Sequence, residues 1–219
     1  MKKTALLMLG AVLAFGISGC HFNRGVKGNG LRRAEQRNLP SFKAVDTTGA
    51  YEVEITCQKP ASFEIEADEN ILPLIKTEVR DGVLFVSTEK RYDTRNPVVL
   101  RITVPELNAV SSSGAGDIKI RDVNGSDLRI ESTGAASINA AGKAKNATIS
   151  STGAGDVEAA GLIAEKAKVS VTGAASVNVY VTDQLDVSVS GVGSVNYSGH
   201  PKTVNKNVSG IGSISEKSD

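Results

Sequence analysis

Few residues in this 219-residue chain have the type and spacing needed for catalysis. Three acids in its repetitive second half could serve as a general acid or base: Asp117, Asp156 and Glu158. Enzymes that cleave polysaccharides need such carboxylates to converge on a groove, usually one walled by aromatic side chains. Aromatic residues make up 4% of this chain and tryptophan is absent. We therefore expect a solvated acidic face, no catalytic residue and no enzyme activity.

The nucleophile candidates are equally sparse. Cys57 continues the alternation of Val53 and Ile55, which is typical of a buried strand residue. A reactive cysteine needs an activating base. The only histidines are His21, near the N-terminus, and His200, beside a proline. We expect Cys57 to be a small core residue without a disulfide partner.

Metal binding is not expected either. Gly-Ala-Gly-Asp at 114–117 and 153–156 resembles glycine-rich calcium repeats, but those have a nine-residue period with an aspartate in every turn. Aspartate in alternate repeats supplies too few oxygen ligands. The sequence also has no zinc-ligand spacing and no phosphate-binding loop. The prediction is therefore no metal and no cofactor.

The dominant feature is a motif that occurs six times between residues 110 and 215. Its central glycines are separated by 20, 19, 20, 18 and 19 residues, a mean of about 19, which is typical of a solenoid. The six are Gly114, Gly134, Gly153, Gly173, Gly191 and Gly210.

Each repeat alternates apolar and small polar residues, the period of a strand. An all-β chain follows, with one coil per repeat and equivalent residues stacked about 4.8 Å apart in parallel strands. One apolar column lies four residues after the glycines: Ile118, Ile138, Val157, Val177, Val195 and Ile214. The column before it alternates acid and serine from Asp117 to Asp156, which keeps like charges about two coils apart.

The first 19 residues predict a secretory signal. Lys2 and Lys3 precede an apolar run from 5 to 15 that is too short to span a membrane. The sequence 17–20, Ile-Ser-Gly-Cys, resembles the bacterial lipobox. That resemblance implies cleavage before Cys20, lipid attachment to Cys20 and an anchored lipoprotein. A residue such as His21, rather than aspartate, directly after the cysteine is similar to the pattern in lipoproteins that are routed to the outer membrane.

Residues 20–39 show no periodicity and predict a flexible basic tether with five arginines or lysines against one glutamate. The tether could be attracted to an anionic bilayer or could be a plain solvated linker. Residues 40–219 have 18 Lys or Arg against 23 Asp or Glu, which argues against a nucleic-acid partner.

Residues 40–215 are predicted to form one β-helix domain, followed by a tail at 216–219. Within it, 40–109 form atypical N-terminal coils and a cap, and 110–215 form six regular repeats. The segment from Val45 aligns without gaps on that from Val110, so the solenoid should begin there. Strands are expected at 62–67, 76–80, 83–88 and 98–104, with a hairpin at Asp81-Gly82 and a short helical turn at 69–75. The last coil has no cap, and its open edge is a possible self-association site.

Several segments together resemble the auto-transporter adhesin, head GIN domain family. They are Phe-Lys-Ala-Val at 42–45, Asn-Ile-Leu at 70–72, Thr-Glu-Val at 77–79, Ile-Thr-Val-Pro-Glu-Leu at 102–107 and the Ser-Gly-Ala-Gly-Asp repeats. The resemblance covers about residues 40–215. It implies a right-handed parallel β-helix and a role in adhesion, and it brings no set of functional residues.

Three functions remain open. The first is a lipid-anchored binding or adhesion module of the bacterial cell envelope, with the membrane and an unknown protein or glycan as partners. The second is a structural or regulatory envelope lipoprotein that binds a periplasmic protein. The third, a carbohydrate-active enzyme on a β-helix, has the least support from the residues.

Overall fold

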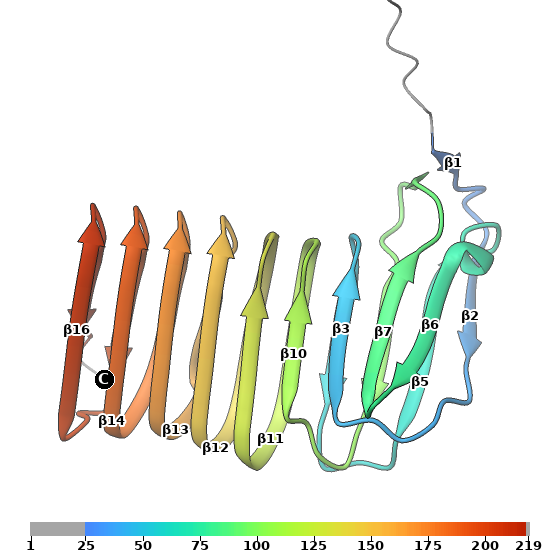
Figure 1. The fold of residues 1–219 in the computed structure, drawn as a ribbon. Coiled ribbons are helices and arrows are strands. Elements are labelled where there is room, and N and C mark those ends of the chain that lie inside the picture. The colour runs from blue at the N-terminus through green and yellow to red at the C-terminus, as the bar shows by residue number, and fades with distance from the viewer. Residues whose placement is uncertain (1–24, 218–219) are drawn as a thin grey trace, which may run out of the picture.

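The computed structural model describes residues 25–217, and the chain forms a solenoid of stacked β-coils with a more irregular N-terminal end (Figure 1). The signal, Cys20 and His21 lie outside the described residues. The one helix is the short 3-10 turn η1 (Leu72–Leu74), and no helix within 25–217 is long and apolar enough to cross a membrane. The strands are β1 (Val26–Lys27), β2 (Arg32–Gln36), β3 (Ala44–Thr48), β4 (Glu52–Thr56), β5 (Ser62–Asp68), β6 (Ile75–Arg80), β7 (Val83–Thr88), β8 (Tyr92–Asp93), β9 (Val99–Thr103), β10 (Ala109–Ser112), β11 (Ala115–Ser132), β12 (Ala135–Gly153), β13 (Val157–Gly173), β14 (Ser176–Gly191), β15 (Ser194–Ser198), β16 (Thr203–Gly210) and β17 (Ser213–Glu216).

The coils stack in the predicted register, which confirms the parallel β-helix of about 19 residues per coil. Ile118 pairs with Ile138, Ile138 with Val157, and Val157 with Val177, all in parallel. The side chains of this column are at most 2% exposed from Ile118 to Val195. Stacked apolar columns of this kind form the core of the molecule, because each coil alone cannot bury its inner face.

The strands are longer than the expected short sides of a coil. Pairing in β11, β12, β13 and β14 continues around the bends of each coil, so one strand covers most of a turn. The register shifts at some points along these strands, for example between Ile120 and Val123, as at a β-bulge. Both neighbours bend together, so the hydrogen bonds between coils survive most of the change of direction.

The repeated glycine stands at a corner where successive coils approach closely. A Cβ atom on Gly134 would lie 2.0 Å from the carbonyl oxygen of Gly114, and one on Gly153 would lie 2.3 Å from that of Gly134. Any side chain would therefore push the coils apart. This close contact explains why the motif has a glycine at this position in all six repeats.

The solenoid begins in the N-terminal segment, as the gapless alignment predicted. Val45 of β3 pairs with Val110, and Val53 of β4 pairs with Ile118. The predicted hairpin is also confirmed, since β6 and β7 pair antiparallel around Asp81-Gly82. Beyond these coils, β5 pairs antiparallel with β9 and β2 pairs antiparallel with β5.

The described part of the expected tether is ordered instead. Within residues 25–39, β1 pairs with β8 and β2 pairs with β5. Side chains also hold this segment, since Arg32 pairs with Glu66 at 3.1 Å and the Arg37 guanidinium donates to the Ile75 carbonyl at 2.7 Å. The departure from the prediction has a physical reason. A short polar edge strand is held by backbone hydrogen bonds to a neighbouring strand and by ion pairs of its side chains, so its sequence shows no alternation of apolar residues.

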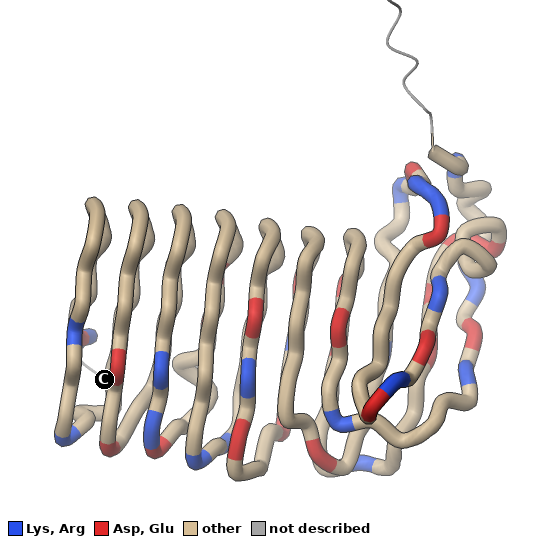
Figure 2. The backbone as a smooth tube through the Cα atoms, in the orientation of Figure 1, with Lys and Arg blue, Asp and Glu red and all other residues tan. Residues whose placement is uncertain are grey.

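The two ends of the solenoid differ. The N-terminal end carries the additional strands and η1, whereas among residues 25–217 β16 pairs only with β14 and β17 only with β15. Charged residues gather at the N-terminal end and along the turns opposite the glycine corners, and the corner side of the coils carries few (Figure 2).

Candidate functional site

Asp117, Asp156 and Glu158 are exposed, as expected for a solvated face, and two of them link neighbouring coils. The Asp156 carboxylate accepts a hydrogen bond from the backbone N–H of Ser176 at 3.0 Å. Glu158 accepts one from the Asn178 amide at 2.7 Å. Asp117 pairs in register with Ser137, so the two aspartates are separated by an intervening coil. The three acids do not converge on a common groove.

Cys57 is a free and buried thiol, 1% exposed. Burial, with a smaller contribution from the negative charge of Asp122, raises its pKa to about 11. A thiol that stays protonated at neutral pH is a poor nucleophile. His200 lies at the other end of the molecule, with its Nδ1 3.3 Å from a Glu216 carboxylate oxygen.

Three carboxylates do converge, but on an arginine. Arg101 of β9 lies 3.0 Å from Glu64, 2.8 Å from Glu66 and 3.7 Å from Glu54. The hydrogen bond from Arg101 is the largest of the effects that lower the pKa of Glu66, and Arg32 adds to it. A general acid needs the opposite shift, so this cluster is an ion-pair network. Within residues 25–217, no three histidine, cysteine or acidic side chains are placed to hold a metal ion.

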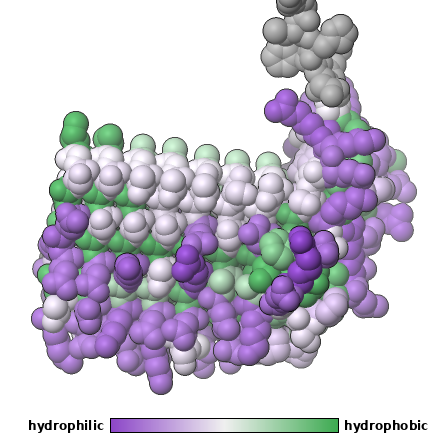
Figure 3. Space-filling model, in the orientation of Figure 1, coloured by the Kyte–Doolittle hydropathy of each residue, from purple (hydrophilic) through white to green (hydrophobic). Residues whose placement is uncertain are grey.

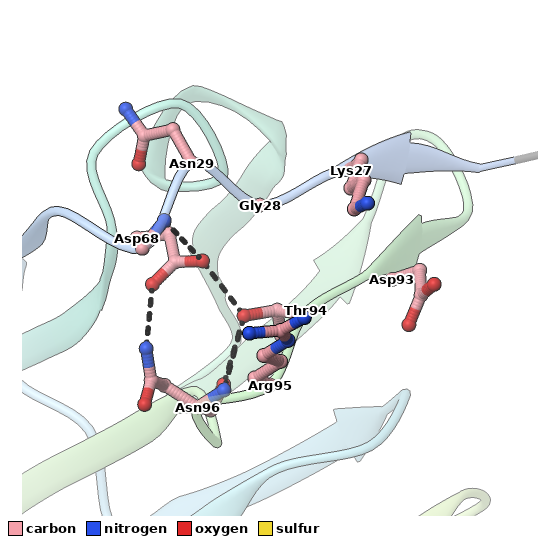
Figure 4. A pocket seen from close by; sticks show the side chains of 9 residues that line it. Lys27, Gly28, Asn29, Asp68, Asp93, Thr94, Arg95 and Asn96 are labelled. Atoms are coloured by element: carbon pink, nitrogen blue, oxygen red, sulfur yellow. Dashed lines mark hydrogen bonds between the residues drawn. The ribbon is translucent and has the colours of Figure 1, made fainter.

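A pocket of about 630 Å³ lies at the N-terminal end, between residues 27–30 and 93–96 (Figure 4). Asp68, at the end of β5, lies at its base and is 2% exposed. Its carboxylate accepts hydrogen bonds from the Thr94 hydroxyl at 2.8 Å, the Asn96 amide at 3.2 Å and the Gly30 N–H at 3.2 Å. These bonds, led by that of Thr94, hold the pKa of Asp68 below its ordinary value.

The walls of this pocket are fixed by backbone contacts. Asn70 accepts from the Asn29 N–H at 2.9 Å and donates to the Lys27 carbonyl at 2.7 Å. Gly28 passes so close to Asp68 that a Cβ atom would lie 2.0 Å from its Oδ2. The parallel pair of β1 and β8 closes one side. The rim carries Lys27, Asp93 and Arg95, so the pocket offers charges for binding and a carboxylate whose hydrogen-bonding capacity is already used.

Sequence reasoning missed Asp68 and Asn70. The alternation over 62–67 predicts a strand correctly, but nothing in it indicates that the following carboxylate would be buried. The signal lies in the segment 27–30, Lys-Gly-Asn-Gly, whose backbone N–H groups need partners. The lack of periodicity in that segment predicts a linker instead.

The other notable surface is the ridge of corners, made by the residue on either side of each repeated glycine. A hydroxyl residue precedes the glycine and an exposed apolar residue follows it. The apolar residue is alanine in the first coils and becomes Val192, 67% exposed, and Ile211, 85% exposed, toward the C-terminal end. Figure 3 shows this ridge as a pale to green line along one side, opposite a hydrophilic side.

The predicted site residue, Cys20, lies outside the described residues, so its modification stays a prediction. The structure therefore presents two separate surfaces, a charged N-terminal pocket and an uncharged ridge. It gathers none of the acids Asp117, Asp156 and Glu158 into a site.

Comparisons with known proteins agree with this architecture. A family model described as "putative auto-transporter adhesin, head GIN domain" matches residues 41–201. A crystal structure of a "putative adhesin" from Bacteroides fragilis has a TM-score of 0.71 and 26% identity, covering 88% of this chain and 100% of its own. A comparison with curated proteins finds no match.

Two more distant crystal structures share the fold. A "putative lipid binding protein" from Parabacteroides distasonis has a TM-score of 0.55 and 21% identity, and a "putative adhesin" from Parabacteroides merdae has 0.52 and 22%. Each covers 88% of this chain and 99% of its own. Because the family model spans most of the sequence and the structure shows the stacked coils that its repeats predict, the chain belongs to the auto-transporter adhesin, head GIN domain family.

Proposed function

We propose that the protein is a lipid-anchored, non-catalytic binding or adhesion module of the bacterial cell envelope. The observation that carries this proposal is that most of the candidate catalytic groups are held in contacts within the fold. Asp156 and Glu158 bond to the next coil, Arg101 pairs with Glu54, Glu64 and Glu66, and Cys57 is buried. What the coils present outward is a broad, rigid surface, which suits recognition. Membership of an adhesin family supports the same role.

The anchor is tested by changing Cys20 to Ser. We expect the variant to leave the membrane fraction and to lose labelling by radioactive palmitate, because the thioether-linked lipid and its neighbouring acyl chain can no longer form. The matched control is Cys57→Ala, which changes the other cysteine of the chain and should leave both readouts unchanged. Continued palmitate labelling of the Cys20→Ser protein would contradict the anchor.

Binding is tested by crosslinking on live cells. A photoreactive side chain at Ala154, on the ridge, and one at Lys145, half a coil away, sample two sides of the same solenoid. Capture of one envelope protein or glycan from one side only supports a recognition surface. Equal, diffuse capture from both positions would contradict it.

A structural or regulatory lipoprotein with a periplasmic partner is the second candidate. The difference is exposure at the cell surface. An adhesion module should be cut by an external protease on intact cells, whereas a periplasmic protein should be cut only after the outer membrane is opened.

A further inference from the structure

The N-terminal end presents four basic side chains in a cluster that we name the basic collar. Its members are Lys27 of β1 and, in the loop that follows β7, Lys90, Arg91 and Arg95, all exposed. None of the four forms an ion pair with any residue in 25–217. The nearby acids leave the collar cationic. Glu89 pairs with Lys76, Asp68 is buried in its own hydrogen bonds, and only Asp93 adds an exposed negative charge.

The collar is held rigidly to the body of the solenoid. The Val26 N–H donates to the Arg91 carbonyl and the Gly28 N–H to the Asp93 carbonyl, both at 2.8 Å. The Tyr92 hydroxyl donates to the Ala50 carbonyl at 2.9 Å, which ties the loop to the first coil. The backbone that carries the four cations is therefore held in a fixed arrangement, which lowers the entropic cost of binding a charged surface.

The position of the collar along the chain points to its occupant. Five residue steps separate Cys20 from Gly25, where the described chain begins. A fully extended chain of that length spans at most about 18 Å. If the proposed lipid on Cys20 is in the membrane, the collar must lie close to the headgroups of the same membrane.

We propose that the basic collar is a membrane-binding surface that takes the anionic phosphate headgroups of the bilayer in which the protein is anchored. Guanidinium groups match phosphate oxygens in bidentate geometry, and ammonium groups add point charges. Each such cation near an anionic surface strengthens binding about fivefold. This proposal rests on the proposed function, because the lipid on Cys20 places the collar at the membrane.

The same contact sets the direction of the solenoid. In Figure 1 the chain enters at β1 on the side where β12, β13, β14 and β16 end, which is the side of the glycine corners. That side shows few charges in Figure 2 and an apolar ridge in Figure 3. Val192 and Ile211 are its largest exposed side chains. The solenoid therefore lies along the bilayer with its ridge facing the lipid, and the charged turns face away. The acids of the repeats nearest to the corners stand three residues from a corner glycine: Asp117 and Asp156 after it and Glu131 before it.

The test separates the collar from the lipid by using the full mature chain with Cys20→Ser, which carries no acyl group. Flotation with vesicles of phosphatidylethanolamine and phosphatidylglycerol should show salt-sensitive binding, and vesicles of phosphatidylcholine alone should show none. The collar variant Lys27→Gln, Arg91→Gln, Arg95→Gln should bind at least tenfold more weakly. The control Lys143→Gln, Lys145→Gln, Lys166→Gln removes the same charge from the opposite turns and should change binding less than threefold.

The proposal is overturned if the unacylated chain does not bind phosphatidylglycerol vesicles, or if the control weakens binding as much as the collar variant. Its fate is distinct from that of the anchor. Palmitate labelling at Cys20 without vesicle binding by the unacylated chain would support the lipid anchor and overturn the proposal for the collar. Vesicle binding without palmitate labelling would support the collar and overturn the lipid anchor.

The orientation has its own readout because the chain has no tryptophan. In the same Cys20→Ser background, Ile211→Trp should show a blue-shifted fluorescence maximum on phosphatidylglycerol vesicles. Lys145→Trp, on the turns opposite the glycine corners, should show no shift. A shift at Lys145→Trp with none at Ile211→Trp would overturn the orientation.

Discussion

The corner glycines show how one missing side chain sets the geometry of the whole stack. Gly134 has no left-handed backbone angle to explain it, so its requirement is steric. A Cβ atom there would lie 2.0 Å from the Gly114 carbonyl oxygen, where no real contact is possible.

Changing Gly134 to Ala should therefore destabilise the protein by about 2 kcal/mol or more, the cost of overpacking a tight contact. Thermal unfolding followed by circular dichroism measures the effect as a lower midpoint. Gly125→Ala is the matched control, because nothing lies within 4 Å of a Cβ atom at that position. Equal midpoints for the two variants would show that the corner contact is not tight.

Asp68 gives a pH dependence that can be worked out from its bonds. Hydrogen bonds, the largest from Thr94, hold its pKa in the folded protein below the ordinary value of 3.8. The ionised carboxylate therefore contributes stability above that value, and the contribution is lost as the pH falls through the folded-state pKa.

Asp68→Asn should lower the free energy of unfolding by about 1–3 kcal/mol at pH 7, because the amide cannot accept from all three donors. The difference from the native protein should shrink as the pH falls below about 4, because the unfolded chain then takes up a proton that the folded carboxylate binds only at lower pH. Denaturant titrations at pH 7 and pH 3 measure both values. Asp93→Asn, on the exposed rim of the same pocket, should have little effect at either pH, and a penalty for Asp68→Asn that is the same at both would contradict the assignment.

These two residues also mark what a single sequence can and cannot predict. The buried column of Ile118, Ile138 and Val157 was predictable, because a period of about 19 residues repeats each local choice six times. Asp68 occurs once, and its environment is built from segments 25–31 and 93–96, far away in the sequence. Alternation reports which face of a strand is buried, and it carries no information on which distant loop covers that face.

At the scale of elements, the two ends of the solenoid handle exposed strand edges differently. The N-terminal edge strands β2 and β6 each carry three charged residues, which oppose pairing with another chain. β16 at the other end carries one, Lys206. Lys206 lies in the inward column after Val169 and Val187, and its ammonium sits 4.7 Å from the centre of the Tyr197 ring. One charge therefore stands where the apolar column would otherwise reach solvent.

Lys206→Val should promote self-association of the protein through the open C-terminal end of the solenoid. The substitution extends the apolar column to the exposed coil and removes the charge that opposes stacking, so we expect self-association at least about tenfold tighter than that of the native protein. Sedimentation velocity over a range of concentrations measures it. Asn207→Val adds an equal apolar side chain on the outward face of β16 and should not have this effect. Unchanged sedimentation of the Lys206→Val protein would mean that the end is closed to stacking for another reason.

For the molecule as a whole, the predicted architecture was right from Val45 onward and incomplete before it. Repetition made the stack predictable, since six copies agree on one register. The described part of 20–39 was expected to be a tether and instead contains β1 and β2, because strands that add to an edge owe their order to partners elsewhere in the chain. The chain between Cys20, the proposed site of lipid attachment, and the folded body is correspondingly shorter than the sequence predicts, and this short distance supports the proposed placement of the basic collar near the membrane.

A stack with a cap at one end and an open coil at the other should also lose its structure unevenly. Each coil contacts only its neighbours, so an end coil has half the support of an inner one. β12 is paired on both sides, by β11 and β13, whereas β16 is paired on one side only, by β14. We expect amide hydrogen exchange to be slow in β12 and at least about a hundredfold faster in β16 and β17, with β13 and β14 between them, because opening from the free end exposes the coils in order. Exchange measured by mass spectrometry on peptides from each strand gives this profile. Uniform protection from β11 to β17 would mean that the solenoid opens as one unit or that its last coil is covered in solution.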